Sequence, residues 1–192
     1  RADKIYVELD VLADRKGTVD NVASYVGLRV TERDQFRATG PDGIWLAFHD
    51  NKIGLITGWP GTKMYVSEFS FASMRHVLIE DDTVNNVITV YIKEGGESQL
   101  VCRFVIQNEH DVKVYDNKGN QKITHTLGHD LNRDGFICFW APAGNAGKSA
   151  FDNIEIRWDE KVRAEYTPTD PETLQDLYSD TWVGMDDENR LV

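Results

Sequence analysis

Four side chains suited to recognising a polar ligand lie in two stretches of alternating polar and apolar residues. Tyr25 and Arg29 belong to SYVGLRVT, and Trp45 and His49 belong to GIWLAFHD. Successive side chains of a strand point to opposite faces, so these four are predicted to share one open, concave sheet face. An aromatic ring there stacks on a sugar, while Arg and His donate hydrogen bonds to its hydroxyl groups. The pattern predicts a carbohydrate-binding site for an oligo- or polysaccharide; the alternative is that Trp45 is covered by loops or a neighbouring domain.

A second set of polar residues has the spacing of a cation site. Asp130, Asn132 and Asp134 in HDLNRDG match the D-x-N-x-D-G start of a calcium loop, although the downstream bidentate Glu is missing. Calcium takes six to eight oxygen ligands, and Asp152 is a further candidate. The sequence thus predicts a structural Ca²⁺ as the one cofactor. The alternative for Asp152 is that it caps a turn by accepting backbone amide hydrogen bonds.

Two carboxylates in the first apolar stretch raise the question of catalysis. Glu8 and Asp10 alternate with apolar residues in KIYVELDVL. Retaining glycoside hydrolysis needs two carboxyl groups about 5–5.5 Å apart. The third carboxylate of a Glu-x-Asp-x-(x)-Glu strand is absent here, and Glu155 and Arg157 in the last strand do not complete a pair. A hydrolase or lyase site built from separated strands remains the alternative to a binding role.

Composition and charge exclude two classes of partner. The 192 residues carry a formal charge of −11, whereas nucleic-acid and anionic-membrane surfaces need clustered Lys and Arg. No apolar run approaches the ~20 residues of a membrane span, so no membrane insertion is expected. Cys102 and Cys138, the 2 cysteines, lie in apolar strand patterns that suit buried thiols; a disulfide between them is the alternative.

Alternating runs recur along most of the chain and are separated by turn residues. About a dozen short strands of this kind predict an all-β fold, an antiparallel two-sheet β-sandwich. The central hairpin pairs IWLAFH with KIGLITG across Asp50 and Asn51. The residues predicted to be buried in the core are Ile44, Leu46, Phe48, Val26, Leu28, Phe104, Phe136, Ile154 and Ile156.

The end of the chain differs in kind from the strands. In Thr169–Trp182, Asp170 is placed to cap a helix whose first turn holds Pro171. We therefore predict a β-sandwich domain over 1–166. The remaining 167–192 is predicted to be a helix and linker that lead to a further domain.

Four stretches occur in an order that resembles a known superfamily. They are GIWLAFHDNKIGLI, RHVLIEDDTVNNVITVYI, VKVYDNKGNQ and GFICFWAPAGNAGKSAFDNIEIRW. Together they resemble the concanavalin A-like lectin/glucanase superfamily, whose members are jelly rolls, over about residues 4 to 158. The closing DLYSDTWVGMDDENRLV is similar to the segment that joins an N-terminal jelly roll to the catalytic domain in bacterial multidomain glycoside hydrolases.

The resemblance implies an accessory domain of a secreted, periplasmic or cell-surface bacterial enzyme that degrades glycans. Such a domain binds a glycan weakly or contacts the catalytic domain of the same chain. A stand-alone sandwich hydrolase or lyase and a structural module without a ligand are the alternatives. Aromatic residues on an exposed sheet face favour binding, whereas two close carboxylates favour catalysis.

Overall fold

All regular secondary structure is antiparallel strand among the residues described by the computed structural model, which are 3–15, 24–31, 42–58, 61–132, 135–141 and 147–159. The strands are β1 (Lys4–Arg15), β2 (Ser24–Val30), β3 (Ile44–His49), β4 (Lys52–Gly58), β5 (Gly61–Val66), β6 (Arg75–Asp82), β7 (Val87–Glu94), β8 (Glu97–Gln107), β9 (Asp111–Asp116), β10 (Gln121–Thr126), β11 (Phe136–Trp140) and β12 (Gly147–Trp158). Residues Arg1–Trp158 form one compact unit. The predicted helix Thr169–Trp182 lies outside the described residues.

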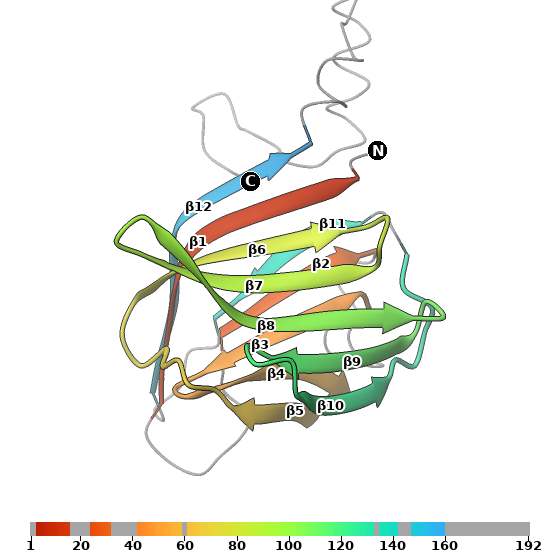
Figure 1. Cartoon of the computed structure of the whole chain (residues 1–192), viewed down its shortest axis with the longest axis horizontal. Helices are drawn as coiled ribbons and strands as arrows, with labels where there is room; N and C mark the ends of the chain where they lie inside the picture. Colours follow the sequence, from red (N-terminus) through yellow and green to blue (C-terminus); the bar gives the residue numbers. More distant parts are fainter. Residues whose placement is uncertain are drawn as a thin grey trace, which may run out of the picture. The chain divides into compact units, whose positions relative to one another are not determined.

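Two antiparallel sheets face each other (Figure 1). The seven-stranded sheet has the order β10-β9-β8-β7-β6-β1-β12, and the five-stranded sheet has the order β11-β2-β3-β4-β5. The prediction of an all-β, antiparallel two-sheet sandwich is confirmed. The central hairpin is confirmed as well, because β3 pairs with β4 from Leu46↔Leu55 to His49↔Lys52. The described ranges contain no helix with the length and hydrophobicity of a membrane span.

The space between the sheets is filled by apolar side chains that solvent does not reach. Ile44, Leu46 and Phe48 of β3 are each 0% exposed, and the ring of Phe71 packs edge-on against Phe48 with centroids 5.1 Å apart. Other predicted core residues are buried with them: Val26, Leu28 and Phe104. Burial of a side chain of this size contributes roughly 1.5–3 kcal/mol. This apolar layer therefore holds the two sheets together.

Three predicted core residues lie away from the centre of this layer. Ile154 is 45% exposed, so its predicted burial is wrong. It belongs to β12, which is an edge strand and has a neighbour on one side only. Ile156 is half-buried against the core, and Phe136 is half-buried in a second apolar cluster.

This second cluster covers the opposite face of the five-stranded sheet. Tyr25, Trp45 and Ala47 belong to it, and these residues alternate along β2 and β3 with the core residues. The cluster separates the two cysteines, because Cys102 lies in the core and Cys138 packs against the second cluster. Neither cysteine takes part in a disulfide, so the alternative of a disulfide between them is wrong.

An irregularity in β2 reverses the direction of one side chain. The pairing of β2 with β11 shifts register next to the Val30↔Phe136 pair. Arg29 at this point has a φ of 56°, and a positive φ in an interrupted ladder is typical of a β-bulge. Val30 consequently joins the second cluster with Tyr25, whereas Arg29 reaches the other sheet. The prediction that Arg29 shares the face of Tyr25 is wrong, because the bulge interrupts the alternation on which it rested.

Arg29 forms a buried ion pair that connects the two sheets. Its Nη2 lies 2.6 Å from Oδ1 of Asp81 on β6, and its Nε donates to Oδ2 at 3.0 Å. The two side chains are only 2% and 1% exposed. Nη1 also donates to Asn86 Oδ1 at 3.0 Å, so the guanidinium has partners on three nitrogens. Such a bidentate contact fixes how one sheet lies against the other.

Replacing one partner of this pair is expected to destabilise the domain strongly. In Arg29→Ala the buried Asp81 carboxylate loses its cation, which typically costs about 3–5 kcal/mol. Urea unfolding of the variant measures the loss. The double variant Arg29→Met/Asp81→Leu leaves no buried charge and should recover much of the stability. A loss of less than about 1 kcal/mol in Arg29→Ala contradicts the buried pair, because that is the range of exposed pairs.

Candidate functional site

The predicted aromatic platform is buried rather than open. Tyr25 is 1% exposed, and Trp45 and His49 are each 6% exposed. The Tyr25 ring stacks on Trp140 with centroids 4.9 Å apart, and Trp45 Nε1 donates to the carbonyl of Asp42 at 2.8 Å. The expectation of an open face at these residues is therefore wrong, and the alternative of a covered Trp45 is correct.

A glycine explains why the Trp45 ring lies flat on its own sheet. Gly27 is the cross-strand partner of Trp45. A Cβ atom at Gly27 would lie 2.7 Å from Cε2 of the indole, so any other residue there would displace the ring. The ring therefore packs over the Gly27 backbone. Trp45 is a packing residue of the second cluster in this arrangement, and its role in sugar binding stays a prediction.

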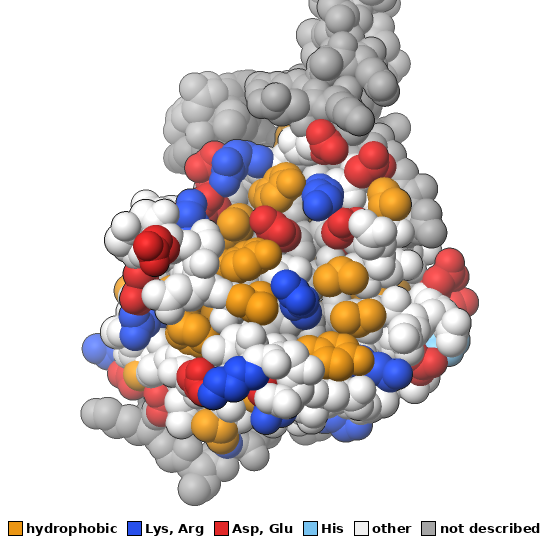
Figure 2. Space-filling model, viewed as in Figure 1, with side chains coloured by type: hydrophobic (Ala, Val, Ile, Leu, Met, Phe, Trp, Pro, Cys, Tyr) orange, Lys and Arg blue, Asp and Glu red, His pale blue; other side chains and the backbone are white. Residues whose placement is uncertain are grey.

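The outward face of the seven-stranded sheet, which we call the outer face, mixes aromatic and charged side chains. Cross-strand partners point to the same side of a sheet, so the register defines its rows. One row is Arg157, Tyr6, Glu80, Thr89, Arg103, Tyr115 and Gln121, and the next is Glu155, Glu8, Leu78, Tyr91 and Leu100. Figure 2 shows hydrophobic, basic and acidic side chains interspersed over the face seen in this view.

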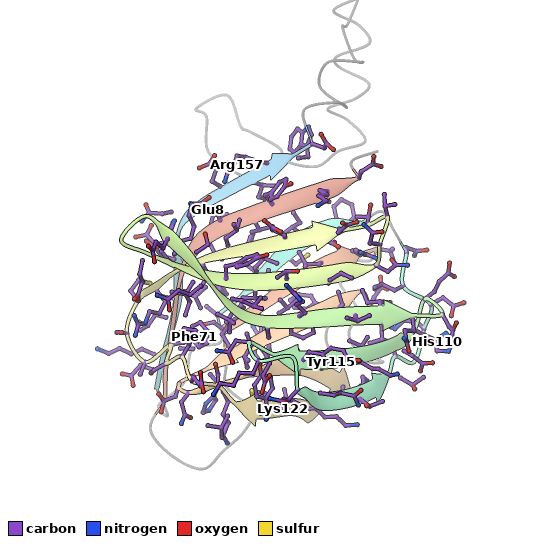
Figure 3. The ribbon with its side chains drawn as sticks, in the orientation of Figure 1. Glu8, Phe71, His110, Tyr115, Lys122 and Arg157 are labelled. Atoms are coloured by element: carbon purple, nitrogen blue, oxygen red, sulfur yellow. The ribbon has the colours of Figure 1, made fainter. Side chains whose placement is uncertain are left out.

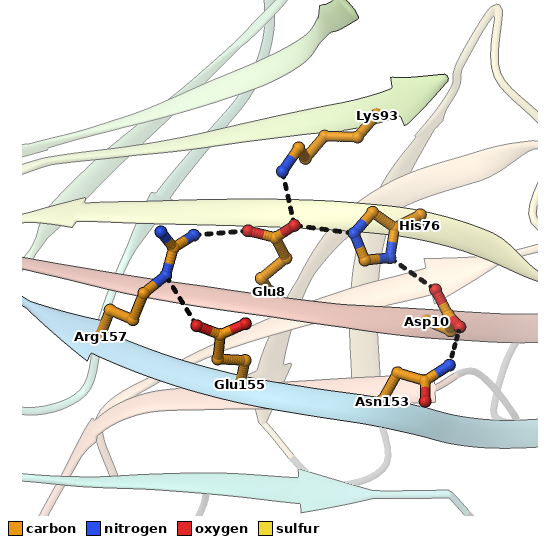
Figure 4. A network of polar contacts seen from close by, with 7 residues as sticks. All are labelled: Glu8, Asp10, His76, Lys93, Asn153, Glu155 and Arg157. Carbon is orange, nitrogen blue, oxygen red and sulfur yellow. Dashed lines mark hydrogen bonds and ion pairs between the residues drawn. The ribbon is translucent and has the colours of Figure 1, made fainter. Parts of the chain in front are cut away.

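Glu8 is the centre of a polar network on this face (Figure 4). Its Oε1 accepts hydrogen bonds from Lys93 and from His76 Nε2, the latter at 2.8 Å, and its Oε2 accepts one from Arg157. Arg157 also pairs with Glu155 at 3.2 Å. The hydrogen bond from Lys93 is the main reason why the pKa of Glu8 lies below its usual value. The Glu8 side chain is 12% exposed and stays ionised.

His76 bridges the two carboxylates of β1. Its Nδ1 lies 2.6 Å from Asp10 Oδ1, and its Nε2 lies 2.8 Å from Glu8 Oε1. A neutral imidazole has one N–H, so only the imidazolium donates to both carboxylates at once. The bonds to Asp10 and then Glu8 accordingly raise the pKa of His76. When it is protonated, the ring donates to both carboxylates and holds Glu8 and Asp10 in fixed positions.

A bulge in β12 adds the last member of the network. The register between β1 and β12 shifts between Glu8 and Asp10, and Asn153 has a φ of 49° at this point. Asn153 Nδ2 thereby reaches Asp10 Oδ2 at 2.6 Å. This bond is the main cause of the lowered pKa of Asp10. Asn153 thereby joins the edge strand β12 to the polar network of the outer face.

The network has the wrong protonation for glycoside hydrolysis by Glu8 and Asp10. Such hydrolysis needs one carboxyl group whose raised pKa keeps it protonated as a general acid. The pKa of Glu8 and the pKa of Asp10 are both lowered, because each carboxylate accepts hydrogen bonds from its neighbours. This pair is therefore suited to accepting hydrogen bonds from a ligand and not to protonating a leaving group.

The sequence pattern marks Glu8 and Asp10 but does not by itself predict a site on the outer face. His76 and Lys93 are outward members of the alternating runs RHVLIED and NVITVYIK, and Tyr91 lies two residues before Lys93. That alternation was the available signal. The order β7-β6-β1-β12, which places these residues side by side, cannot be read from local spacing.

The predicted calcium ligands make contacts of other kinds. Asp130 is 78% exposed and pairs with His110 Nδ1 at 3.3 Å. Asp152 Oδ1 accepts the backbone amide of Asn153 at 2.8 Å, which is the capping contact of the alternative interpretation. Asn132 is exposed, and Asp134 lies outside the described residues. No group of three or more His, Cys, Asp or Glu suited to a metal occurs within the described ranges.

Comparisons with known proteins give little for this chain. No family model matches it. No curated protein matches it at a significant level. Among solved structures, it is similar to the carbohydrate binding module CBM66 from Bacillus subtilis, with 10% identity, coverage of 81% of this chain and 75% of that chain, and a TM-score of 0.26. A likeness at this level carries no argument about function.

The His76 network predicts a specific pH dependence of stability. His76 has a raised pKa, so its contribution is present below the ordinary value of 6.5 and is lost as the pH rises through its folded pKa. The lowered pKa values of Glu8 and Asp10 give contributions that are present above the ordinary 4.5 and 3.8 and are lost as the pH falls. His76, Glu8 and Asp10 therefore all stabilise the fold between the ordinary pKa of Glu, 4.5, and that of His, 6.5.

We therefore expect His76→Gln to lower the free energy of unfolding most near pH 5 to 6 and less near pH 8. The loss should be about 1 kcal/mol or less, because the contacts of His76 with Glu8 and Asp10 are partly exposed. Urea unfolding across this range measures the difference. His125→Gln is the matched control, since burial lowers the pKa of His125 and its contribution grows as the pH rises. If the free energy of unfolding differs between wild type and His76→Gln by the same amount at every pH, the bridge is contradicted.

Calcium binding stays a prediction with a direct test. If Asp130, Asn132 and Asp134 bind the ion, excess calcium must raise the melting temperature, because a ligand of the folded state alone stabilises it. At one hundred times its dissociation constant the gain is about 2.7 kcal/mol. Asp130→Asn should reduce the shift. Equal melting temperatures in calcium and in chelator contradict the site.

Proposed function

We propose that this domain binds carbohydrate on the outer face of the seven-stranded sheet and does not itself catalyse a reaction. The observation that carries the proposal is the placement of Tyr6 and Tyr91 beside the network centred on Glu8. Tyr6 is the cross-strand partner of Arg157, and Tyr91 is the partner of Leu78, which lies opposite Glu8. Both tyrosines are half-buried, so their rings are held in place yet reach the surface.

Each part of this surface suits one part of a sugar. A tyrosine ring stacks against the apolar C–H face of a pyranose, and its hydroxyl group keeps a polar contact. The carboxylates of Glu8 and Asp10 accept hydrogen bonds from sugar hydroxyl groups, whereas Lys93 and Arg157 donate them. The network holds these groups before a ligand arrives, which lowers the entropy cost of binding.

The expected affinity is weak. A sheet face leaves much of a bound sugar in contact with water, and bridging waters supply part of the hydrogen bonding. We expect dissociation constants from about 10 μM to 1 mM, or about −7 to −4 kcal/mol. Weak binding suits a domain that keeps a tethered enzyme close to a polymer, because effective concentration then adds to affinity.

We further propose that the domain is a concanavalin A-like accessory module of a secreted or cell-surface glycan-degrading enzyme. The order of the four sequence stretches supports this context. The residues after 159 lie outside the described ranges and supply no argument on it. The alternative is contact with a catalytic domain of the same chain, which would use the same aromatic face without a sugar.

Replacing the central tyrosine tests the proposal. Tyr91→Ala should weaken binding to a responsive oligosaccharide at least tenfold, about 1.4 kcal/mol, because the stacking surface is lost. Tyr91→Phe should keep most of the affinity, since it keeps the ring. Isothermal titration against plant, algal and bacterial oligosaccharides measures both variants, and urea unfolding checks that each is folded.

Val66→Ala serves as the matched control. Val66 is 66% exposed and ends β5 of the other sheet, so its truncation should leave binding unchanged. Absence of binding to every oligosaccharide, or equal affinity of wild type and Tyr91→Ala, contradicts the proposed function.

A further inference from the structure

Two basic side chains on the outer face, Arg103 and Lys113, differ from Arg157 and Lys93 in making no ion pair within the described ranges. Arg157 and Lys93 are both neutralised by Glu8. Arg103 on β8 and Lys113 on β9 make no ion pair or side-chain hydrogen bond with any residue in the described ranges. The chain has 32 acidic and only 21 basic residues, so acidic partners are abundant. Two cations without an ion pair on one sheet face can therefore accommodate an external anion.

The register places these cations within reach of one ligand group. Arg103 lies opposite Tyr115, and Lys113 lies two residues before Tyr115 on the same strand. Diagonal neighbours of this kind have Cβ atoms about 7–8 Å apart, which long side chains span. Arg103 is exposed, and Lys113 is half-buried. Lys113 also contributes, as the weakest of several causes, to the lowered pKa of Asp111, whose carboxylate accepts a hydrogen bond from Thr126 at 2.6 Å.

The pair adjoins the aromatic surface that we propose for sugar binding. Arg103 is the cross-strand partner of Thr89, and Tyr91 follows two residues later on the same face. The pKa of Tyr91 is raised by burial and by Glu80, while Arg103 acts in the opposite direction, as expected for a guanidinium near the phenol. Figure 3 shows Tyr115 on β9, whereas Glu8 and Arg157 lie on β1 and β12. A chain of sugars across β7 and β8 would therefore meet the cations beyond the tyrosine.

We propose that Arg103 and Lys113 form a subsite for an anionic group, carboxylate or sulfate, of a sugar bound beside Tyr91. This inference rests on the proposed function and specifies its ligand as an acidic glycan. A guanidinium can donate two parallel hydrogen bonds to a carboxylate or sulfate, and an ammonium adds a point charge. Tyr115 lies opposite Arg103 on the neighbouring strand, and its half-buried side chain can contact the same ligand.

Matched pairs of probes separate the two sources of the anion. Oligogalacturonate is compared with its methyl ester for the carboxylate, and a sulfated galactan oligosaccharide with its desulfated form for the sulfate. We expect one acidic member to bind the full chain about tenfold more tightly than its neutral counterpart. Added salt should reduce this preference, because the site is exposed and screened.

The double variant Arg103→Gln/Lys113→Gln should bind the acidic and neutral members equally while keeping the affinity for the neutral one. Lys118→Gln is the matched control, because it removes a charge from the exposed β9–β10 turn, where Lys118 pairs with Glu68. Lys118→Gln should still bind the acidic probe more tightly than its neutral counterpart. Both variants replace exposed or half-buried side chains, and urea unfolding verifies their folding.

Each outcome decides one of the two proposals. A preference for an acidic probe that disappears only in the double variant supports the subsite. Neutral probes that bind as tightly as acidic ones, or a preference that survives in the double variant, overturn the subsite and leave the proposed function standing. If no acidic or neutral probe binds, and no oligosaccharide of the broader panel binds either, both the subsite and the proposed function are overturned.

Discussion

The packing of one sheet against the other is the constraint on which the rest of this structure depends. Each sheet must bury one face, and residues such as Phe48 and Phe104 fill the space between them with no exposure to solvent. The inner positions of the seven-stranded sheet are thereby committed to apolar side chains. Its outward positions on β1, β6 and β7 are left for polar chemistry. The same period of two that builds the core therefore places Glu8, His76 and Lys93 on one face.

Interruptions of this alternation have consequences at two places. The bulge at Arg29 directs a cation inward, where Asp81 and Asn86 neutralise and hold it. The bulge at Asn153 directs an amide onto Asp10 at the edge of the outer face. At Arg29 the extra residue changes the face that the side chain serves, without ending the strand. One bulge thus stabilises the sandwich, and the other completes a surface network.

Charge is distributed unequally over the outer face. Around Glu8, three cations satisfy one carboxylate, and His76 needs its second proton to serve both of its partners. Around Arg103 the charge is not balanced within the described part of the domain. A preorganised hydrogen-bonding network beside two cations that make no ion pair is suited to a ligand with hydroxyl groups along its length and a negative group at one position. Strand order produces this arrangement, because Glu8 and Asp10 of β1 lie next to β6, whereas Arg103 of β8 lies next to β9.

Local alternation of apolar and polar residues was enough to predict the class of fold, the central hairpin and most of the core. Alternation is a local property, and Ile44, Leu46 and Phe48 are recognisable within six residues of chain. The sequence also marked Glu8 and Asp10 as outward carboxylates. Only the tertiary structure decided that His76, Lys93 and Arg157 meet Glu8, because they lie 68, 85 and 149 residues away. It also decided that Tyr25 and Trp45 are buried and that Arg29 turns inward, since coverage of a face and the position of a bulge depend on neighbouring strands and not on local spacing.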